Sequence, residues 1–405
     1  MTRAEPAAAA ASIPELRLKR GEERRLAAGH LWVFSNEIDT DATPLTAFAP
    51  GDPVRVVSDR ERFLGYAYVN PRSLISARIV GRDPGYPIGK SLIVHRLQVA
   101  LSLRRRLYEQ PYYRLVYGES DELPGLVIDR YGDVCVAQIG TAGMERLKAE
   151  IAAALEKVIR PAGLLWKNDS GARELEGLPE YTEVAFGTVP DKVDVTENGV
   201  RYSVPLAQGQ KTGWFFDQAL NRATFLKYVP GARVLDVFSY LGAWGIAAAR
   251  HGATDVTCVE TSPQAAEWIQ ANAARNGVKL EVRKGDAFEV LEALHGARER
   301  FDVVVLDPPA FIKRRKDAAK GQAAYRKLNQ LGLQLLSRDA MLVSCSCSYH
   351  LTGEALLGAI QKAARHVSRF VQVLETGGQA PDHPVHPAIP ETRYLKAYFC
   401  RAVQD

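Results

Sequence analysis

Residues 233–260, RVLDVFSYLGAWGIAAARHGATDVTCVE, decide the fold of the second half of the chain. Two apolar runs, at 233–238 and 255–260, flank a stretch of helical character that begins near Gly242. Runs with this continuous apolar character are typical of strands that are buried on both faces of a parallel sheet. The stretch therefore predicts one strand–helix–strand unit.

The same alternation continues downstream. A helix is expected over 263–276, because Ser262 is a good N-cap, Pro263 suits the first helical position and Gly277 follows the end. Further buried strands are expected at 301–307 and 340–346. Repeated units of this kind predict an α/β, Rossmann-like domain with a doubly wound, mostly parallel sheet.

The first half of the chain has a different pattern of predicted strands and helices. Residues 16–82 hold short strand-like runs separated by Gly, Pro, Asn and Asp, which predict a small β-rich barrel or sandwich. Helical patterns near 91–110 and 144–158, with strand-like runs between and after them, predict an α+β unit. We therefore expect a flexible tail followed by three domains, with boundaries at 1–14, 15–84, 85–203 and 204–405.

Composition narrows the function classes. The 405 residues are 46% hydrophobic and 24% charged, which excludes a disordered chain. No apolar run approaches the roughly 18 residues of a transmembrane helix, so we expect no membrane span. Five cysteines are too few and too scattered for a disulfide framework and favour a cytoplasmic location. The net charge of +5 is compatible with a polyanionic partner.

Polar and glycine residues gather where the predicted strands end, which is where such sheets bind ligands. Each feature alone has a structural reading, as a glycine-rich turn or as an acid at a strand end. In order, however, they resemble the motif series of class I S-adenosylmethionine-dependent methyltransferases. The resemblance implies S-adenosylmethionine as cofactor, bound by residues of D-x-F-x-Y-x-G, of the next strand end, of GDAF and of the fourth strand end: Asp236, Phe238, Tyr240, Gly242, Glu260, Asp286 and Asp307.

The fourth strand of this domain ends in Asp307-Pro308-Pro309-Ala310-Phe311. The prolines either stop the strand or stiffen a loop that presents the Asp307 carboxylate to a substrate. In nucleic-acid methyltransferases a loop of this type holds the target base. The segment 313–327 that follows has seven basic side chains against one acid, so it is either a solvated helix or a phosphate-binding surface. Candidate RNA contacts are Pro308, Phe311, Lys313, Arg314, Arg315 and Lys316.

Two cysteines, Cys345 and Cys347, end the next predicted strand. They could be buried apolar residues, metal ligands together with His350, or a nucleophile, and we prefer the nucleophile. A thiolate that adds to carbon 6 of a pyrimidine makes carbon 5 able to accept a methyl group, and an acid near ring nitrogen 3 stabilises the adduct. Asp307 suits the acid.

Taken together, these features resemble, over nearly the whole chain, the bacterial large-subunit ribosomal RNA cytosine-5 methyltransferases of the RlmI type. The resemblance implies an N-terminal PUA domain, a central α+β domain and a methyltransferase domain that acts on ribosomal RNA. It also implies that Gln218 lines the cofactor pocket and that Cys347 is the nucleophile, while a second cysteine for product release is absent at Ala310. The stretches that carry it are GHLWVFSNEI (29–38), GESDELPGLVIDRYG (118–132), QKTGWFFDQ (210–218), DVFSYLG (236–242), DPPAF (307–311), SCS (346–348), DHPV (382–385) and YLK (394–396).

Position along the strand also favours Cys347 over Cys345. Cys345 ends an apolar run and should lie inside the sheet, where burial raises the pKa of a thiol, whereas Cys347 should lie beyond the strand. His383 or a water is a candidate for removing the carbon 5 proton, with a plain surface loop as the alternative for Asp382 and His383. Two other functions stay open: methylation of guanine N7 or an amino group, and an RNA-binding assembly factor without catalysis. No metal is expected, and a homodimer is left open.

Overall fold

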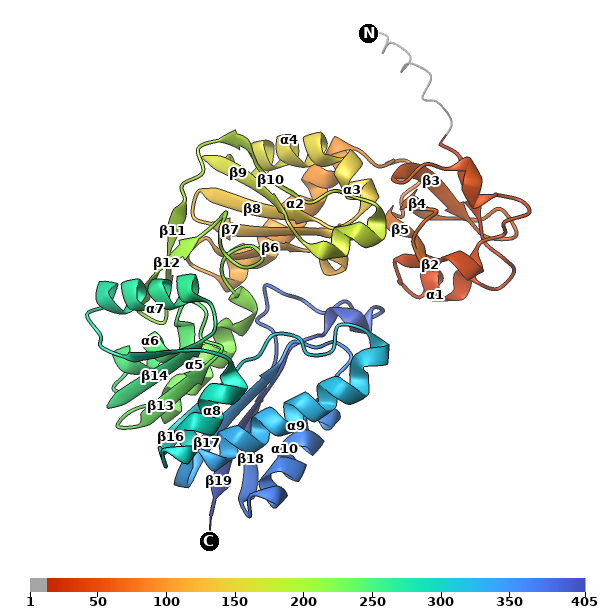
Figure 1. Ribbon diagram of the computed structural model, residues 1–405. Coiled ribbons are helices and arrows are strands. Elements are labelled where there is room, and N and C mark those ends of the chain that lie inside the picture. The colour runs from red at the N-terminus through yellow and green to blue at the C-terminus, as the bar shows by residue number, and fades with distance from the viewer. Residues whose placement is uncertain (1–12, 405) are drawn as a thin grey trace. The chain divides into compact units, whose positions relative to one another are not determined.

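The computed structural model describes residues 13–404, so most of the predicted tail at 1–14 lies outside the described residues (Figure 1). The chain divides into two compact units. Unit 1 holds the described residues up to Asp191, together with Leu206–Gly213 and Pro384–Thr392. Unit 2 holds Lys192–Pro205, Trp214–His383 and the residues from Arg393 onward.

Unit 1 begins with a five-stranded sheet of order β1-β3-β4-β5-β2, in which β1 is parallel to β3 and the other pairs are antiparallel. Alternating apolar residues, among them Leu16, Val33 and Val54, form its core. A short helix that the sequence did not predict, α1 (Glu23–Ala27), separates the first two strands in the chain. The strands are β1 (Glu15–Arg17), β2 (Trp32–Phe34), β3 (Asp52–Val57), β4 (Phe63–Val69) and β5 (Ile75–Gly81).

The second sheet of unit 1 has the order β10-β9-β8-β7-β6. Helices α2 and α4 pack against each other, and their apolar residues join the core of this sheet, which makes it an α+β layer. The pattern predicted near 144–158 is split into two helices, α3 and α4. The elements are α2 (Lys90–Leu107), β6 (Tyr112–Tyr117), β7 (Leu126–Tyr131), β8 (Val134–Ile139), α3 (Ala142–Arg146), α4 (Lys148–Val158), β9 (Gly163–Asn168) and β10 (Tyr181–Gly187).

Unit 2 is built on a seven-stranded sheet of order β15-β14-β13-β16-β17-β19-β18. The first five strands in this order are parallel, and β19 runs antiparallel to both of its neighbours. This topology confirms the predicted Rossmann-like, mostly parallel sheet. The strands are β13 (Arg233–Val237), β14 (Asp255–Glu260), β15 (Glu281–Lys284), β16 (Phe301–Leu306), β17 (Leu336–Ser346), β18 (Phe370–Gly377) and β19 (Lys396–Val403), beside a separate hairpin of β11 (Lys192–Glu197) and β12 (Val200–Pro205).

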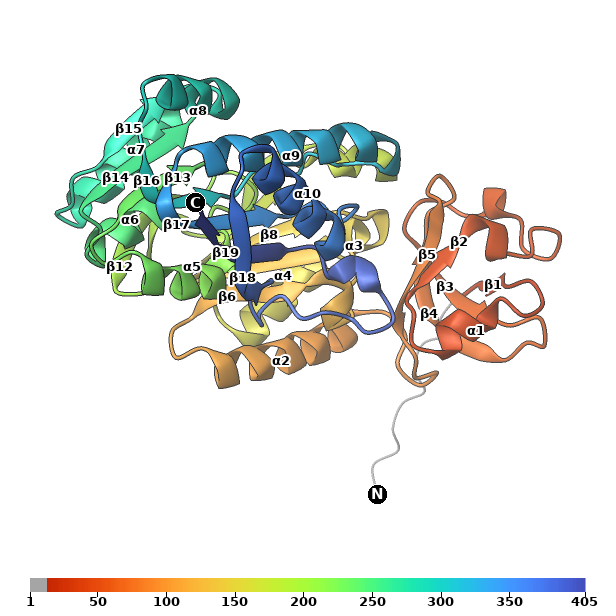
Figure 2. The same ribbon diagram turned by 90° about the horizontal axis from the view of Figure 1, so that it is seen from below.

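Helices cover both faces of this sheet, as a doubly wound fold requires. Apolar residues of α8, α9 and α10 share one core cluster, and those of α5, α6 and α7 share another. Figure 2 shows α9 and α10 lying side by side along the sheet. The helices are α5 (Ala219–Phe225), α6 (Ala243–Arg250), α7 (Pro263–Arg275), α8 (Ala287–Gly296), α9 (Ala318–Gln334) and α10 (Gly353–His366).

The predicted cap of α7 is present, since the Ser262 side chain accepts a hydrogen bond from the Ala265 N–H and Pro263 occupies the first turn. The helix ends at Arg275, one residue before the predicted end. Within residues 13–404, none of the helices is both long enough and apolar enough to span a membrane.

Candidate functional site

The loop between β13 and α6 has an unusual backbone. Phe238, Tyr240 and Gly242 all have positive φ, at 68°, 51° and 77°. For bulky aromatic residues this left-handed conformation is strained, at a cost of roughly 1–3 kcal/mol each, and such strain is typical of functional sites. All three are residues of the predicted cofactor motif, so the strain lies where the sequence predicts a ligand.

Asp236 lies inside the sheet with no exposed surface. Its Oδ2 accepts a hydrogen bond of 3.0 Å from the Gly245 N–H, whereas its buried Oδ1 has no hydrogen-bond partner among the described residues. Burial raises the pKa of Asp236 to about 7, and the nearby carboxylates of Asp307 and Glu260 add to this effect. An orphaned buried oxygen of this kind is a place where a ligand can donate a hydrogen bond.

Glu260, the last residue of β14, is also buried. Its Oε2 accepts from the Tyr240 N–H and its Oε1 from the Ser262 N–H, both at 2.8 Å. One carboxylate therefore joins the strained loop after β13 to the turn that starts α7. Each oxygen keeps a further lone pair with which it can accept another hydrogen bond.

Asp286 follows β15 and lies on the surface. It is the N-cap of α8, and its Oδ1 accepts from the N–H groups of Phe288 and Glu289 at 2.9 and 3.3 Å. The predicted cofactor residue thus has a capping role in the structure.

Asp307 follows β16, and each of its oxygens accepts one hydrogen bond. The Gln218 amide donates to Oδ1 at 2.8 Å, and the Trp244 indole donates to Oδ2 at 3.1 Å. The pKa of Asp307 is raised to about 6, mainly by burial and also by the Asp217 carboxylate, while the two hydrogen bonds and the Arg222 cation act in the opposite direction. The group is therefore fixed in place and holds a proton more readily than an ordinary aspartate.

The two cysteines lie as strand position predicts. Cys345 is inside β17, opposite Ala397 of β19, and is fully buried, which raises the pKa of its thiol well above the usual range. Cys347 comes one residue after the end of β17 and is half-buried. Its thiol donates to the carbonyl oxygen of Pro308 at 3.9 Å, so Cys347 lies beside the loop that carries Asp307.

A lysine approaches Cys347 from the neighbouring strand. Lys396, the first residue of β19, donates hydrogen bonds from Nζ to the carbonyl oxygens of Ser348 and Tyr394, at 2.6 and 2.8 Å. Burial lowers the pKa of Lys396 to about 8, and negative charge on Cys347 opposes this shift. Cys347 is the one charged group that acts on the pKa of Lys396 among the described residues, so the two side chains influence each other's ionisation.

Hydroxyl groups connect the end of β17 by hydrogen bonds to the loop that contains Pro308 and Pro309, the Pro-Pro loop. Ser348 Oγ accepts from the Ile312 N–H at 3.1 Å and lies 3.0 Å from the Tyr325 hydroxyl, which also accepts from Ser346 Oγ at 2.9 Å. Tyr325 belongs to α9, so helix, strand end and loop form one connected structure around Cys347.

The predicted RNA contacts fall into two groups. Phe311 packs on Tyr325 and Phe288, with ring centroids 4.8 and 6.2 Å apart, and Pro308 is buried, so both support the loop. The basic side chains are exposed, and only Arg314 pairs with an acid, Asp317, in the part of the chain that the structure describes. The exposed group is Lys313, Arg314, Arg315 and Lys316.

Asp382 and His383 are buried, so the alternative of a plain surface loop is wrong. His383 Nδ1 lies 2.8 Å from Asp382 Oδ1. The preceding residues join this loop to α5, because Asn221 Nδ2 bonds both the Gly378 carbonyl and the side chain of Gln218. Gln218 in turn holds Asp307.

Sequence reasoning missed three residues of this site. Trp244 lies in the stretch 233–260, yet nothing in the sequence indicates that its indole reaches Asp307 on another strand. Lys396 lay in the YLK stretch, and only the strand order of the sheet brings it to Cys347. Tyr325 had no signal beyond its place in a basic segment. Within residues 13–404, no group of three or more His, Cys, Asp or Glu side chains is placed to hold a metal ion.

Comparison with known proteins gives the family. A model of a PUA-like domain matches residues 16–82, and a model of S-adenosylmethionine-dependent methyltransferases matches residues 180–399. Ribosomal RNA large subunit methyltransferase I of Tolumonas auensis is 35% identical, over 95% of this chain and 98% of that protein. The protein of the same name from Klebsiella pneumoniae (strain 342) is 34% identical, over 96% and 99%.

Solved structures share the fold of the whole chain. A candidate SAM-dependent methyltransferase from Streptococcus mutans has a TM-score of 0.80 at 22% identity, covering 95% of this chain and 100% of that one. The sequence resemblance is confirmed by relatives that match nearly end to end. The chain therefore belongs to the ribosomal RNA large subunit methyltransferase I family and is an S-adenosylmethionine-dependent methyltransferase.

Proposed function

We propose that this protein methylates carbon 5 of a cytosine in large-subunit ribosomal RNA, with Cys347 as nucleophile and Asp307 as acid. One observation carries the proposal: the Cys347 thiol bonds the carbonyl of Pro308, the residue that follows Asp307. A thiol and a carboxyl group of raised pKa thus flank one position at the carboxyl end of the sheet. The relatives of this family are named for large-subunit ribosomal RNA, which supports the substrate.

The residues around β13 and β14 fit S-adenosylmethionine. The buried Oδ1 of Asp236 lacks a hydrogen-bond partner among residues 13–404, and Glu260 can accept further hydrogen bonds, so donors such as ribose hydroxyls and an ammonium find acceptors here. Phe238, Tyr240 and Gly242 shape the loop between these acids. When bound, S-adenosylmethionine supplies an electrophilic methyl group. We assign Asp286 and Gln218 to the same pocket by their motif positions.

Cys347 is the side chain suited to activating the pyrimidine. Its thiolate adds to carbon 6, the Cys347–carbon 6 bond forms, and the electron pair of the 5,6 double bond moves into the ring toward nitrogen 3. Asp307 donates a proton at nitrogen 3, which neutralises the developing charge and leaves a nucleophilic enamine at carbon 5. Once carbon 5 carries the methyl group, nitrogen 3 returns its proton to Asp307 and a base takes the proton of carbon 5. The electron pair of that C–H bond re-forms the 5,6 double bond and expels the Cys347 thiolate from carbon 6.

The pKa values of the two supporting groups match these roles. The pKa of Asp307 is near 6, so this group can gain and lose a proton close to neutral pH. A catalytic acid needs this property, because it must give up a proton and later take one back. Lys396 offers a positive charge beside Cys347 and thereby favours the thiolate. Tyr325 and Ser348 keep the cysteine and the Asp307 loop in register through their hydrogen bonds.

The target cytosine must be unpaired or flipped out, because carbons 5 and 6 are shielded in a stacked helix and flipping costs a few kcal/mol. The exposed basic residues after the Pro-Pro loop are placed to hold phosphates near the target. The PUA-like match at 16–82 supports a second RNA-binding surface.

The test is incubation of the protein with labelled S-adenosylmethionine and unmodified large-subunit ribosomal RNA, followed by nucleoside mass spectrometry. Label in 5-methylcytidine is expected. Label in 7-methylguanosine or in an amino-methylated base would overturn the cytosine assignment, and no transfer to RNA at all would overturn the RNA substrate.

A further inference from the structure

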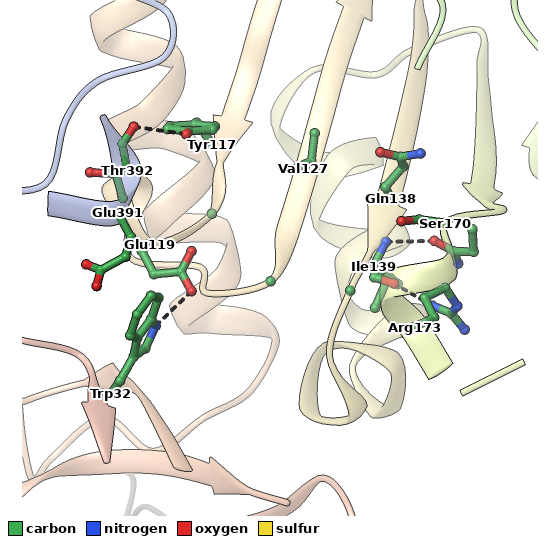
Figure 3. A pocket seen from close by; sticks show the side chains of 14 residues that line it. Trp32, Tyr117, Glu119, Val127, Gln138, Ile139, Ser170, Arg173, Glu391 and Thr392 are labelled. Atoms are coloured by element: carbon green, nitrogen blue, oxygen red, sulfur yellow. Dashed lines mark hydrogen bonds between the residues drawn. The ribbon is translucent and has the colours of Figure 1, made fainter. Parts of the chain in front are cut away.

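Unit 1 contains a pocket of about 330 Å³ that the methyltransferase chemistry does not use (Figure 3). Its walls come from β2, from the ends of β7, β8 and β9, from the turn at 118–121 and from the segment 390–392. The volume falls at the lower end of the roughly 300–1,000 Å³ that small-molecule sites occupy. The polar groups on these walls define what the pocket can bind.

Charged side chains of opposite sign lie on different sides of the pocket. Figure 3 shows Glu119 and Glu391 on the side of Trp32, with Arg173 on the other side. Oε2 of Glu391 and Nη2 of Arg173 are buried and have no hydrogen-bond partner among residues 13–404. An acceptor and a donor thus both lack partners within the walls of one pocket, and a ligand with complementary groups satisfies both.

The rest of the Arg173 guanidinium is fixed. Arg173 is 1% exposed, its Nε bonds the Pro179 carbonyl at 2.8 Å, and its Nη1 bonds Glu145 Oε2 at 2.9 Å. The remaining N–H group is therefore held in one orientation, as in a built recognition site. The Asn168 side chain, which accepts from the Ile139 N–H at 2.6 Å, lies on the same wall.

Trp32 contributes an aromatic plane. Its indole donates to Glu119 Oε1 at 2.9 Å, which fixes the ring, and the side chain is only half-buried. Aromatic rings held in this way are platforms on which unpaired bases stack.

The charges of the pocket exclude a phosphate ligand. Glu119 and Glu391 are carboxylates, while the positive charge of Arg173 is already paired with Glu145. A phosphate would face two carboxylates, whereas a neutral planar ring with acceptors on one edge and N–H donors on another suits both walls. Guanine has this pattern, with O6 and N7 as acceptors toward Arg173 and its N1–H and N2–H groups toward Glu391.

We propose that this pocket binds one unpaired guanine of the RNA substrate, outside the methylation site. The inference rests on the proposed RNA substrate, and it adds a position at which the protein reads sequence. Adenine is rejected because it presents an amino group where guanine presents O6.

The test uses labelled pentaribonucleotides UUGUU, UUAUU and UUCUU and measures fluorescence anisotropy with the full chain. UUGUU is expected to bind about tenfold more tightly than UUAUU, the order of one bidentate contact. Glu391→Gln removes the charge and exchanges one acceptor oxygen for an N–H donor, and Val127→Trp fills the pocket, so both should abolish the preference. Glu174→Gln removes an exposed carboxylate outside the pocket and should keep it.

Equal thermal midpoints and equal affinity for S-adenosylmethionine show that the variants are folded. A wild type without guanine preference, a preference that survives both pocket variants, or binding of an arginine peptide in place of guanosine would overturn the inference. If 5-methylcytidine forms while the preference is absent, only the pocket inference fails. If the preference is present and no 5-methylcytidine forms, the proposed function fails and the pocket stands.

Discussion

Lys396 Nζ donates a 2.6 Å hydrogen bond to the carbonyl oxygen of Ser348, the residue after Cys347. The bond holds the positive charge of Lys396 next to the proposed nucleophile. The acceptor is a neutral carbonyl group, so the charge of Lys396 is not neutralised by this bond. A cation in this position stabilises a thiolate.

Lys396→Met should therefore slow the alkylation of Cys347 by iodoacetamide roughly tenfold at neutral pH, because the thiolate fraction falls when the nearby charge is lost. Lys396→Arg should restore part of the rate. Mass spectrometry of the Cys347 peptide gives the rate at each pH, and Lys362→Met, on the exposed face of α10, is the control. Equal pH profiles in wild type and Lys396→Met would show that Lys396 has only a structural role.

Cys347→Ala should abolish methyl transfer and the covalent adduct with RNA that contains 5-fluorocytosine, since the carbon 6 bond cannot form. Cys345→Ala should retain both and lose about 1 kcal/mol of stability, because only a buried sulfur is removed. Denaturing gels of the adduct separate the outcomes. Loss of the adduct in Cys345→Ala, with Cys347→Ala still active, would reverse the assignment.

Gly245→Ala should weaken S-adenosylmethionine binding and lower stability by about 1–3 kcal/mol. A Cβ at Gly245 would lie 2.5 Å from Cys258 Sγ and 3.2 Å from Asp236 Oδ2, so it would disturb the carboxylate with the orphaned oxygen. Calorimetry gives the affinity, and Cys258→Ala in the same chain should rescue part of it by making room. Gly296→Ala, where a Cβ meets nothing within 4 Å, is the matched control.

The double variant Arg315→Glu and Lys316→Glu should bind RNA more weakly and reduce the slope of log K against log salt by about 1–2. Both side chains are exposed beyond the Pro-Pro loop. The affinity for S-adenosylmethionine should not change. The pair Lys279→Glu and Lys362→Glu removes the same charge elsewhere, and a slope change of equal size in that control would indicate a general effect of net charge.

Folding stability should decrease as the pH rises from about 4 to about 7. The pKa of Asp236 is about 7 in the folded chain, against an ordinary value of 3.8 for the unfolded chain. At a pH between these two values the folded state therefore holds a proton that the unfolded state releases. Stability is thus highest below this window and levels off above it. Asp236→Asn should flatten the thermal midpoint against pH, and parallel curves for the two proteins would contradict the buried-acid explanation.

Much of the fold followed from local patterns. Continuous apolar runs marked β13, β14 and β16, and Ser262 with Pro263 marked the start of α7, because these features act over a few residues. The antiparallel insertion of β19 between β17 and β18 had no such signal, since strand order depends on contacts between distant segments.

The candidate site likewise contains residues with a local sequence signal and contacts that depend on distant segments. Asp236, Glu260 and Asp307 were predicted as site residues from their positions at strand ends. The hydrogen bond from Trp244 to Asp307 and the approach of Lys396 to Cys347 arise only when different strands meet. The surface-loop alternative for Asp382 and His383 stayed open in the sequence because a proline-rich polar stretch is typical of surface loops, and only the structure shows that both are buried.

The place of β19 in the sheet has a consequence for biosynthesis. Cys347, Asp307 and the β13 loop are all translated before Lys396, yet the charge beside the cysteine arrives only when Lys396–Val403 pairs with β17. A nascent chain that has emerged only as far as α10 therefore contains the proposed nucleophile without the neighbouring cation. Under the proposed mechanism, we therefore expect the Cys347 thiol to become reactive only after β19 has joined the sheet.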